Sequence, residues 1–173
     1  MSKNETRSAN RKSDIISAAI EVFAETGYFR ATTAQVAERA KISQPYIFRF
    51  FSTKEALLLT ALEVSWTRII DSFRKVVESA SPEQLETDLI RAYEEILNTY
   101  QNEVLLQMQA QTIREDSIRE AMRGGFREVR RMVLDAFRAA GIPNAEERTM
   151  LFLARGMLCN ISAALLMPEL MET

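Results

Sequence analysis

Apolar residues recur along most of the chain at intervals of three and four, the spacing of one face of an α-helix. The first such run extends from Ile16 to Phe23, and it is followed by Gly27, a residue type common just after helices. We therefore predict an amphipathic helix that begins at Lys12 and ends before this glycine. Residues 1–11 are polar and show no periodicity, so we expect them to form a mobile arm.

Two short helices are predicted next, over residues 33–40 and 44–51. Thr32 and Gln35 match a capping box at the start of the first helix, and the turn "KIS" separates it from the second. Pro45 lies in the first turn of the second helix, where its missing N–H costs nothing. A longer helix followed by two short ones across a three-residue turn is typical of a helix-turn-helix motif.

The remaining chain is also predicted to be helical. Ser52 and Glu55 match a second capping box, which starts a long helix that ends near Ser79. The further predicted helices begin at Ser81-Pro82, Asn102, Ser117 and Asn144. Gly124-Gly125 interrupts the third of these as a hinge, a site of close helix approach or a helix break. The predicted fold is all-α, with about eight or nine helices: a helix-turn-helix domain at residues 1–53 and a helical bundle at residues 54–173.

Composition excludes several functional classes. The chain contains 47% hydrophobic and 27% charged residues, as a globular protein does. It has no histidine, which excludes histidine-based catalytic triads and metal sites, and it has no phosphate-binding glycine loop. The single cysteine, Cys159, excludes an internal disulfide and suits a reducing compartment. We expect no enzymatic activity, no cofactor or metal, no secretory signal, no membrane span and a cytoplasmic location.

Charge is distributed unevenly along the chain. Residues 1–54 carry nine Lys/Arg and five Asp/Glu, a balance of +4, whereas the remainder has a balance of −6. A basic amino-terminal third predicts a polyanion as the partner of that part of the chain. The basic residues of the arm either form a solvated tail or reach a neighbouring groove of DNA. These residues are Lys3, Arg7, Arg11 and Lys12.

A helical wheel divides residues 44–51 between two faces. The residues predicted to pack against the first helix are Ile47, Phe50 and Phe51. The residues predicted to face outward, or to lie at the edge of that face, are Gln44, Pro45, Tyr46, Phe48 and Arg49. Glutamine pairs with adenine, arginine with guanine or phosphate, and rings and proline contact thymine methyl groups. The outward face therefore predicts an element that enters the major groove of DNA.

Thr33 and Lys54 are candidate phosphate contacts at two helix starts. A cation in the first turn of a helix costs roughly 0.3–1 kcal/mol, unless an anion such as phosphate lies there. Glu55 beside Lys54 is an alternative source of that negative charge. Thr33 offers a hydroxyl and a backbone N–H to a phosphate, although a plain helix start explains it equally well.

Residues 15–58 resemble the DNA-binding domain of the TetR/AcrR family of bacterial transcriptional regulators. The matching positions are Phe23, Ala24, Gly27, Thr32, Thr33, Val36, Ala37, Ala40, Ile42, Ser43, Phe51, Lys54 and Glu55. The resemblance implies a homodimer that binds a palindromic operator in double-stranded DNA, commonly as a repressor released by a small molecule. It implies phosphate contacts at Thr33 and Lys54 and base contacts from Gln44, Pro45 and Tyr46.

Three positions depart from the family pattern. Phe48 replaces the usual tyrosine and loses its phenol–phosphate hydrogen bond. Lys41 replaces a common turn glycine, at a cost of roughly 1 kcal/mol or more in a left-handed conformation. Ala34 is too short to reach a base. The operator sequence is therefore not predictable from the resemblance.

The rest of the chain predicts a dimer interface and a candidate ligand pocket. The last helix is apolar on nearly all sides from Met150 to Met167, which one subunit alone cannot bury. We therefore predict a homodimer through roughly residues 126–140 and 145–167, the last two helices, which pair across a two-fold axis in the family.

A small hydrophobic effector, implied by the family, would be bound by adaptable apolar side chains. The candidates are Trp66, Phe73, Tyr93, Tyr100, Met108 and Met122, each of which is equally typical of a plain core. The pocket is expected to be modest or absent. The alternative function is a ligand-binding helical bundle that does not bind DNA.

Overall fold

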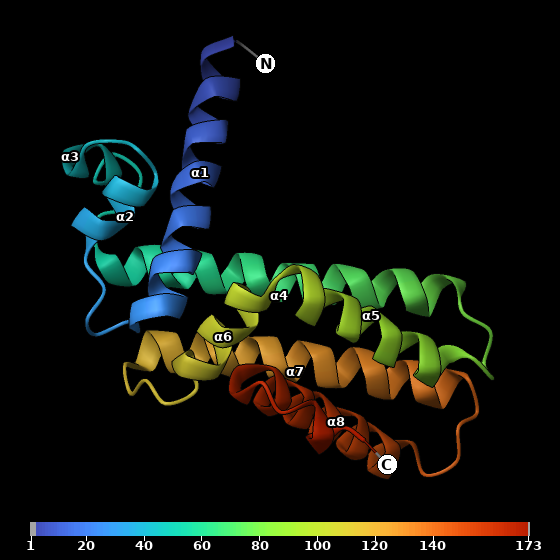
Figure 1. Cartoon of the computed structure of the whole chain (residues 1–173). Helices are drawn as coiled ribbons and strands as arrows, with labels where there is room; N and C mark the ends of the chain where they lie inside the picture. Colours follow the sequence, from blue (N-terminus) through green and yellow to red (C-terminus); the bar gives the residue numbers. More distant parts are fainter. Residues whose placement is uncertain (1–2, 173) are drawn as a thin grey trace.

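The computed structural model describes the backbone of residues 3–172 and the side chains from residue 8 onward. The helices are α1 (Lys3–Thr26), α2 (Thr33–Arg39), α3 (Gln44–Ile47), α4 (Lys54–Ser79), α5 (Leu85–Thr99), α6 (Gln101–Ala110), α7 (Asp116–Ala139), α8 (Ala145–Leu165) and the 3-10 helix η1 (Pro168–Leu170). Figure 1 shows α1 rising from a body formed by α4–α8, with α2 and α3 beside it. The predicted all-α fold, a helix-turn-helix on a helical bundle, is confirmed.

Helix α1 begins at Lys3 rather than at Lys12, so the predicted mobile arm is wrong for residues 3–11. Once the buried second half of α1 has formed, each further turn adds hydrogen bonds without a new nucleation cost. No Gly or Pro interrupts this segment. Residues 8–14 are exposed, and this end of α1 projects away from the body in Figure 1. The side chains of Lys3 and Arg7, considered above for DNA contact, lie outside the described residues.

Hydrogen bonds cap the start of helix α2, and ion pairs join its end to α1. The predicted capping box is confirmed: the Gln35 N–H donates to Thr32 Oγ1 at 3.2 Å, and the Thr32 N–H donates to Gln35 Oε1 at 2.8 Å. At the other end, Arg39 pairs with Glu21 and Glu25 of α1 at 2.7 Å each. The hydrogen bond from Arg39 holds the pKa of Glu25 below its usual range.

Helix α3 is shorter than predicted and ends at Ile47 instead of continuing to Phe51. The N–H groups of Phe50 and Phe51 both donate to the Ile47 carbonyl, at 2.9 and 3.0 Å, so the chain turns tightly there. In the turn before α3, Lys41 has a φ of 54°. This left-handed conformation costs a non-glycine residue roughly 1–2 kcal/mol.

Two helices begin a few residues later in the sequence than predicted. Thr53, not Ser52, caps α4, because its Oγ1 accepts the N–H of Ala56 at 3.0 Å. Helix α5 begins at Leu85 rather than at Pro82, because residues 82–84 form a turn. The other body helices begin within two residues of the predicted positions.

One continuous hydrophobic core extends through both predicted domains. Its largest fully buried side chains include Phe23 of α1, Leu58 and Phe73 of α4, and Phe137 of α7. The division of the chain at residues 53 and 54 therefore stays a prediction. Within residues 3–172, no helix combines the length and apolar character needed to cross a bilayer.

Helix α7 continues through Gly124-Gly125, so this pair is neither a break nor a hinge. A Cβ at Gly125 would lie 2.1 Å from two ring carbons of Trp66, whereas a Cβ at Gly124 would meet nothing within 4 Å. Gly125 therefore lets α7 approach the indole on α4, which is the close-approach interpretation of the pair. The helical hydrogen bonds and this contact outweigh the low helix propensity of glycine.

We expect Gly125→Ala to destabilise the fold by about 1–3 kcal/mol, because the new methyl group would force the indole aside. Gly124→Ala is the matched control, since it should raise the free energy of unfolding by about 0.5–1 kcal/mol. Urea unfolding followed by circular dichroism would measure both. Equal stabilities of the two variants would contradict the close approach.

Candidate functional site

The residues around α3 divide between core and solvent as the helical wheel predicts. Ile47 and Phe51 are 0% and 4% exposed, and Phe48 is 50% exposed. The other exposed residues of this segment are Gln44, Pro45 and Arg49, and the half-buried ones are Tyr46 and Phe50. The structure thus gathers the predicted base-contacting side chains on one accessible surface beside α2.

Arg49 lies against an aromatic ring on this surface. Its guanidinium carbon is 5.2 Å from the centroid of Tyr46, whose ring packs edge-on against Phe50 at 5.4 Å. This stacking limits the conformations of the Arg49 side chain, while its N–H donors stay exposed. The Tyr46 ring therefore stabilises the Arg49 guanidinium by a cation–π contact. Part of the Tyr46 ring itself remains exposed.

Thr33 and Gln44 contact each other, which the sequence did not indicate. The Gln44 side-chain Nε2 donates to Thr33 Oγ1 at 2.8 Å, across the turn between α2 and α3. The candidate phosphate contact Thr33 is therefore hydrogen-bonded to Gln44, the first candidate base contact.

Lys54 makes internal hydrogen bonds. Its Nζ donates to the carbonyl oxygens of Tyr28 and Ala31 at 2.7 and 2.9 Å, with Phe29 O at 3.4 Å. The ammonium also lies 4.6 Å from the Tyr28 ring centroid. Lys54 thus fastens the loop between α1 and α2 to the start of α4. The phosphate contact by Lys54 stays a prediction, and the side chain would have to give up these bonds to make it.

We expect Lys54→Ala to lower the free energy of unfolding by about 1–3 kcal/mol, because several loop carbonyls would lose their donor. Lys75→Ala removes an exposed lysine from the same helix and serves as the control. Urea titration would compare the two variants with the wild type. A Lys54→Ala variant as stable as the control would show that these bonds contribute nothing.

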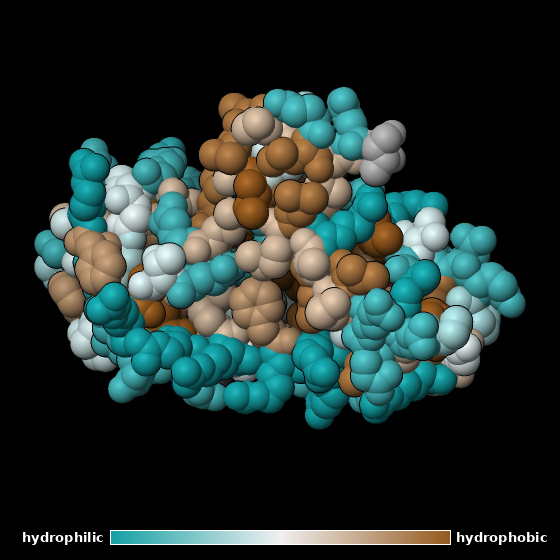
Figure 2. All heavy atoms as spheres, turned by 90° about the horizontal axis from the view of Figure 1, so that it is seen from below, coloured by the Kyte–Doolittle hydropathy of each residue, from teal (hydrophilic) through white to brown (hydrophobic). Residues whose placement is uncertain are grey.

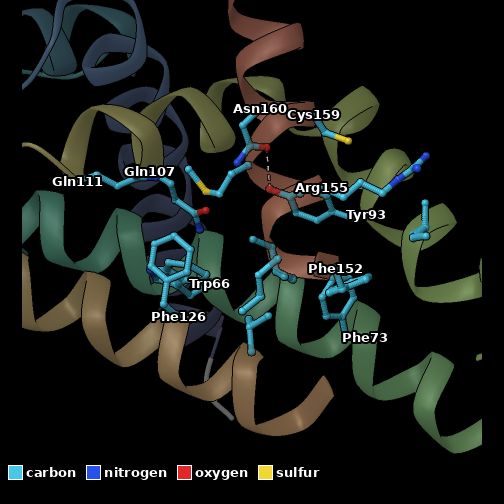
Figure 3. Close-up of a pocket in the computed structure, with 16 residues that line it drawn as sticks. Trp66, Phe73, Tyr93, Gln107, Gln111, Phe126, Phe152, Arg155, Cys159 and Asn160 are labelled. Atoms are coloured by element: carbon cyan, nitrogen blue, oxygen red, sulfur yellow. Dashed lines mark hydrogen bonds between the residues drawn. The ribbon is translucent and has the colours of Figure 1, made fainter. Parts of the chain in front are cut away.

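A second candidate site is a cavity in the body, between α4, α5, α6, α7 and α8. Trp66, Phe73 and Tyr93, three of the predicted ligand contacts, line it, and Phe126 and Phe152 complete its aromatic wall (Figure 3). Its volume is about 50 Å³, the space of one or two water molecules. Ligand pockets usually measure about 300–1,000 Å³, so a ligand would have to displace side chains to enter.

Polar groups are placed within this apolar wall. The Tyr93 hydroxyl donates to Asn160 Oδ1 at 2.8 Å, as Figure 3 shows, and burial raises the pKa of Tyr93 to about 12. Gln107 Nε2 donates to Ser65 Oγ at 2.6 Å. Trp66 Nε1 is buried, and no group in the described part of the chain accepts its hydrogen. This donor lies close to Gly125 of α7, where a Cβ would be 2.5 Å from Nε1.

The other three predicted ligand contacts lie outside this cavity. Tyr100 lies at the α5–α6 junction, where its ring stacks with the Arg68 guanidinium at 4.2 Å. Met122 is buried and borders a separate groove between α6 and α7, and Met108 is half-buried on α6. Helical spacing alone did not distinguish the helix faces that converge on the cavity.

Sequence reasoning missed the polar residues of the cavity. Gln107 is 5% and Asn160 is 5% exposed, and each stands directly between two apolar residues in the sequence, which was the available signal. Gln109, two positions further on α6, donates through Nε2 to the Ala24 carbonyl near the end of α1 at 2.8 Å. Its Oε1 is buried, and no group among the described residues donates to it.

A third candidate site is the exposed face of α8. Figure 2 shows hydrophobic side chains gathered over α8, beside a hydrophilic strip along α7. The apolar residues on this face are spaced alternately by three and four, as in a coiled coil. This α8 seam consists of Leu151, Ala154, Leu158, Ile161 and Leu165. Leu151 and Leu165 are 52% and 60% exposed, which is unusual for a contiguous apolar row.

The structure thus combines a helix-turn-helix unit with a helical body that contains a small cavity. Residues 15–61 match the family model described as "Bacterial regulatory proteins, tetR family". The chain is 33% identical over 76 residues to the HTH-type transcriptional regulator HbdR of Aromatoleum sp. (strain CIB). That match covers 44% of this chain and 30% of HbdR, so it spans less than a third of that relative.

The whole fold resembles solved structures of the same kind. A TetR transcription regulator from Haloarcula marismortui has a TM-score of 0.78 and 22% identity, covering 94% of this chain and 91% of that one. The regulator FadR from Bacillus subtilis, in complex with stearoyl-CoA, has a TM-score of 0.74 and 15% identity, covering 93% and 89%. Residues 15–61 of the chain thus match the tetR family, and the chain as a whole shares the fold of these solved structures.

Proposed function

We propose that the chain binds double-stranded DNA through α3 and the starts of α2 and α4, as a sequence-specific regulator of transcription. The observation that carries this proposal is the accessible surface of Gln44, Pro45, Phe48 and Arg49 over a buried Ile47. Their chemistry matches base edges and thymine methyl groups in the major groove. Arg39 and Lys54 hold this surface to α1 and α4, so little order has to be gained on binding.

The net positive charge of residues 1–54 supports the same partner, because phosphate neutralisation supplies much of the affinity of DNA-binding proteins. Phe48 is suited to apolar contact rather than to a phosphate hydrogen bond. The alternative, a ligand-binding bundle that does not touch DNA, does not account for the exposed Phe48 and Arg49 beside Gln44.

Selection of bound sequences from random duplex DNA would test this function. The expected result is a palindromic motif whose half-sites lie about one helical turn, or a multiple of it, apart. Affinity for this motif should fall steeply as the salt concentration increases, because phosphate contacts release counterions. Failure of the protein to enrich any motif would favour the ligand-binding alternative.

We propose further that the protein is a homodimer through the α8 seam, with α7 at its edge, as expected for residues 126–140 and 145–167. The exposed positions of α7 carry arginines such as Arg127, Arg131 and Arg138. A central apolar row with a charged border is the usual anatomy of a protein interface. A dimer also supplies the two DNA-reading units that a palindromic operator needs.

We expect Leu158→Glu to convert the dimer to a monomer, because the carboxylate would be buried at the centre of the seam. Light scattering after gel filtration would measure the mass. Phe29→Glu, which replaces an apolar side chain that is 70% exposed on the helix-turn-helix unit, is the control and should stay dimeric. A dimeric Leu158→Glu protein would place the interface elsewhere.

The cavity supports a role in effector binding, with a small and largely apolar molecule as the ligand. Binding would open the cavity beside the Trp66 ring. FadR of Bacillus subtilis, which has a similar fold, is in complex with stearoyl-CoA, a ligand with a long apolar acyl chain, and this supports the proposal. We propose that such an effector releases the protein from DNA, which makes the protein a repressor.

Trp66 is the single tryptophan of the chain, so its fluorescence reports on the cavity. Titration with octanoate or with a simple phenol is expected to shift the emission maximum in a saturable manner. Gly156→Val is the control, because a Cβ there lies 3.5 Å from the Tyr93 ring and a larger side chain fills the cavity. An equal shift in this variant would indicate binding elsewhere.

A further inference from the structure

The groove between α6 and α7 combines an apolar floor with a basic rim. Its apolar residues are Ala110, Met122 and Phe126, and its arginines, one helical turn apart on α7, are Arg119, Arg123 and Arg127. The volume of this α6–α7 groove is about 500 Å³, which lies within the roughly 300–1,000 Å³ of ligand pockets. The groove is therefore large enough for a ligand as it stands, whereas the cavity beside it is not.

Helix α7 differs in charge from the rest of the body. Residues 55–173 carry 13 Lys/Arg and 19 Asp/Glu, a balance of −6, whereas α7 alone carries six arginines against four acidic residues. It contains no lysine. Arginine presents a planar fork of N–H donors that matches the oxygens of a carboxylate or a phosphate. This surface therefore favours an anion with that geometry.

Only exposed acidic side chains oppose the arginines of the groove. Glu120 lies 3.8 Å from Arg123 and 3.5 Å from Arg127. Arg119 is held more firmly, since it lies 3.3 Å from Asp116 and donates to the Arg114 carbonyl at 2.9 Å. Long ion pairs in water contribute little stability. An anionic ligand can therefore replace Glu120 as the partner of Arg123 and Arg127.

The groove and the cavity share part of their lining. Phe126 and Gln111 border both of them. The Phe126 ring is half-buried and packs edge-on against the Trp66 ring, with 5.0 Å between the centroids. In Figure 3, Gln111 and Phe126 lie at one end of the cavity, and the Arg155 side chain extends at the other. Rotation of the Phe126 ring would join the groove to the cavity.

We infer that the effector is an amphiphile with an anionic head and a single aliphatic chain. The head, a carboxylate or a phosphate, binds Arg123 and Arg127 in the α6–α7 groove, and the chain passes Phe126 into the cavity. This inference rests on the proposed effector binding and names the ligand class. Arg155 is the competing site for the head, but it is a single cation and lies 3.8 Å from Glu94.

Calorimetric titration with decanoate, decyl phosphate and decanol, each below its micelle concentration, tests the head group. The wild type should bind the two anions about tenfold more tightly than the alcohol, because charge-assisted hydrogen bonds form only with the anions. Arg123→Gln should weaken both anions by about fivefold and leave decanol within about twofold. Arg130→Gln is the control, because it removes an exposed arginine of the same helix that does not line the groove.

A second variant tests the path of the chain. Gly156→Val narrows the cavity beside the Tyr93 ring and leaves the arginines intact. It should weaken decanoate, decyl phosphate and decanol alike by about tenfold, because all three would lose the same apolar contact. The circular dichroism of Arg123→Gln and Gly156→Val should match that of the wild type.

Three results would overturn the inference. In the first, decanol binds as tightly as the two anions. In the second, Arg123→Gln binds the anions as the wild type does, or Arg155→Gln weakens them instead. In the third, Gly156→Val weakens decanol but not the anions. Each of these leaves a ligand in the cavity, so the proposed effector binding stands. Absence of binding by all three compounds would overturn the effector binding together with the inference.

Discussion

The packing of the second half of α1 constrains the rest of the structure. This segment contacts α2, α4 and α6, and Phe23 at its centre is fully buried. Two side-chain donors then bind the end of α1 and the loop after it to the body. Gln109 of α6 donates to the Ala24 carbonyl, and Lys54 of α4 donates to the carbonyls of Tyr28 and Ala31. The orientation of the helix-turn-helix unit on the body is therefore set by directional bonds in addition to apolar contact.

Helix α6 connects this junction to the cavity. It packs against α1, α4, α5, α7 and α8, and its polar residues point in more than one direction. Gln107 lines the cavity and bonds to Ser65 of α4, whereas Gln109 bonds to the end of α1. Because the cavity is small, a ligand of useful size would have to shift its wall. A shift of α6 would then move Gln109 and change its hydrogen bond to the Ala24 carbonyl of α1, with no intervening residue.

Local sequence patterns were enough to predict most of the helices and the outward face of α3. The capping box at Thr32 and the division between Ile47 and Phe48 follow from short sequence patterns, whereas the left-handed turn at Lys41 was suggested only by the family resemblance. Contacts between distant segments could not be predicted, because no local pattern places Gln44 beside Thr33 or the Lys54 ammonium on the loop carbonyls. The continuation of α7 through Gly125 likewise depends on the position of the Trp66 ring, which only the tertiary structure determines.

The spacing of the α8 seam has a consequence for the shape of a dimer. An apolar row that alternates three and four residues favours helices that cross at roughly 20° and wind around each other to the left. This crossing would fix the distance between the two helix-turn-helix units, although the seam lies on a different helix from the DNA-reading surface. Side-chain size along α8, rather than any residue near DNA, would then decide which operator spacing the protein accommodates.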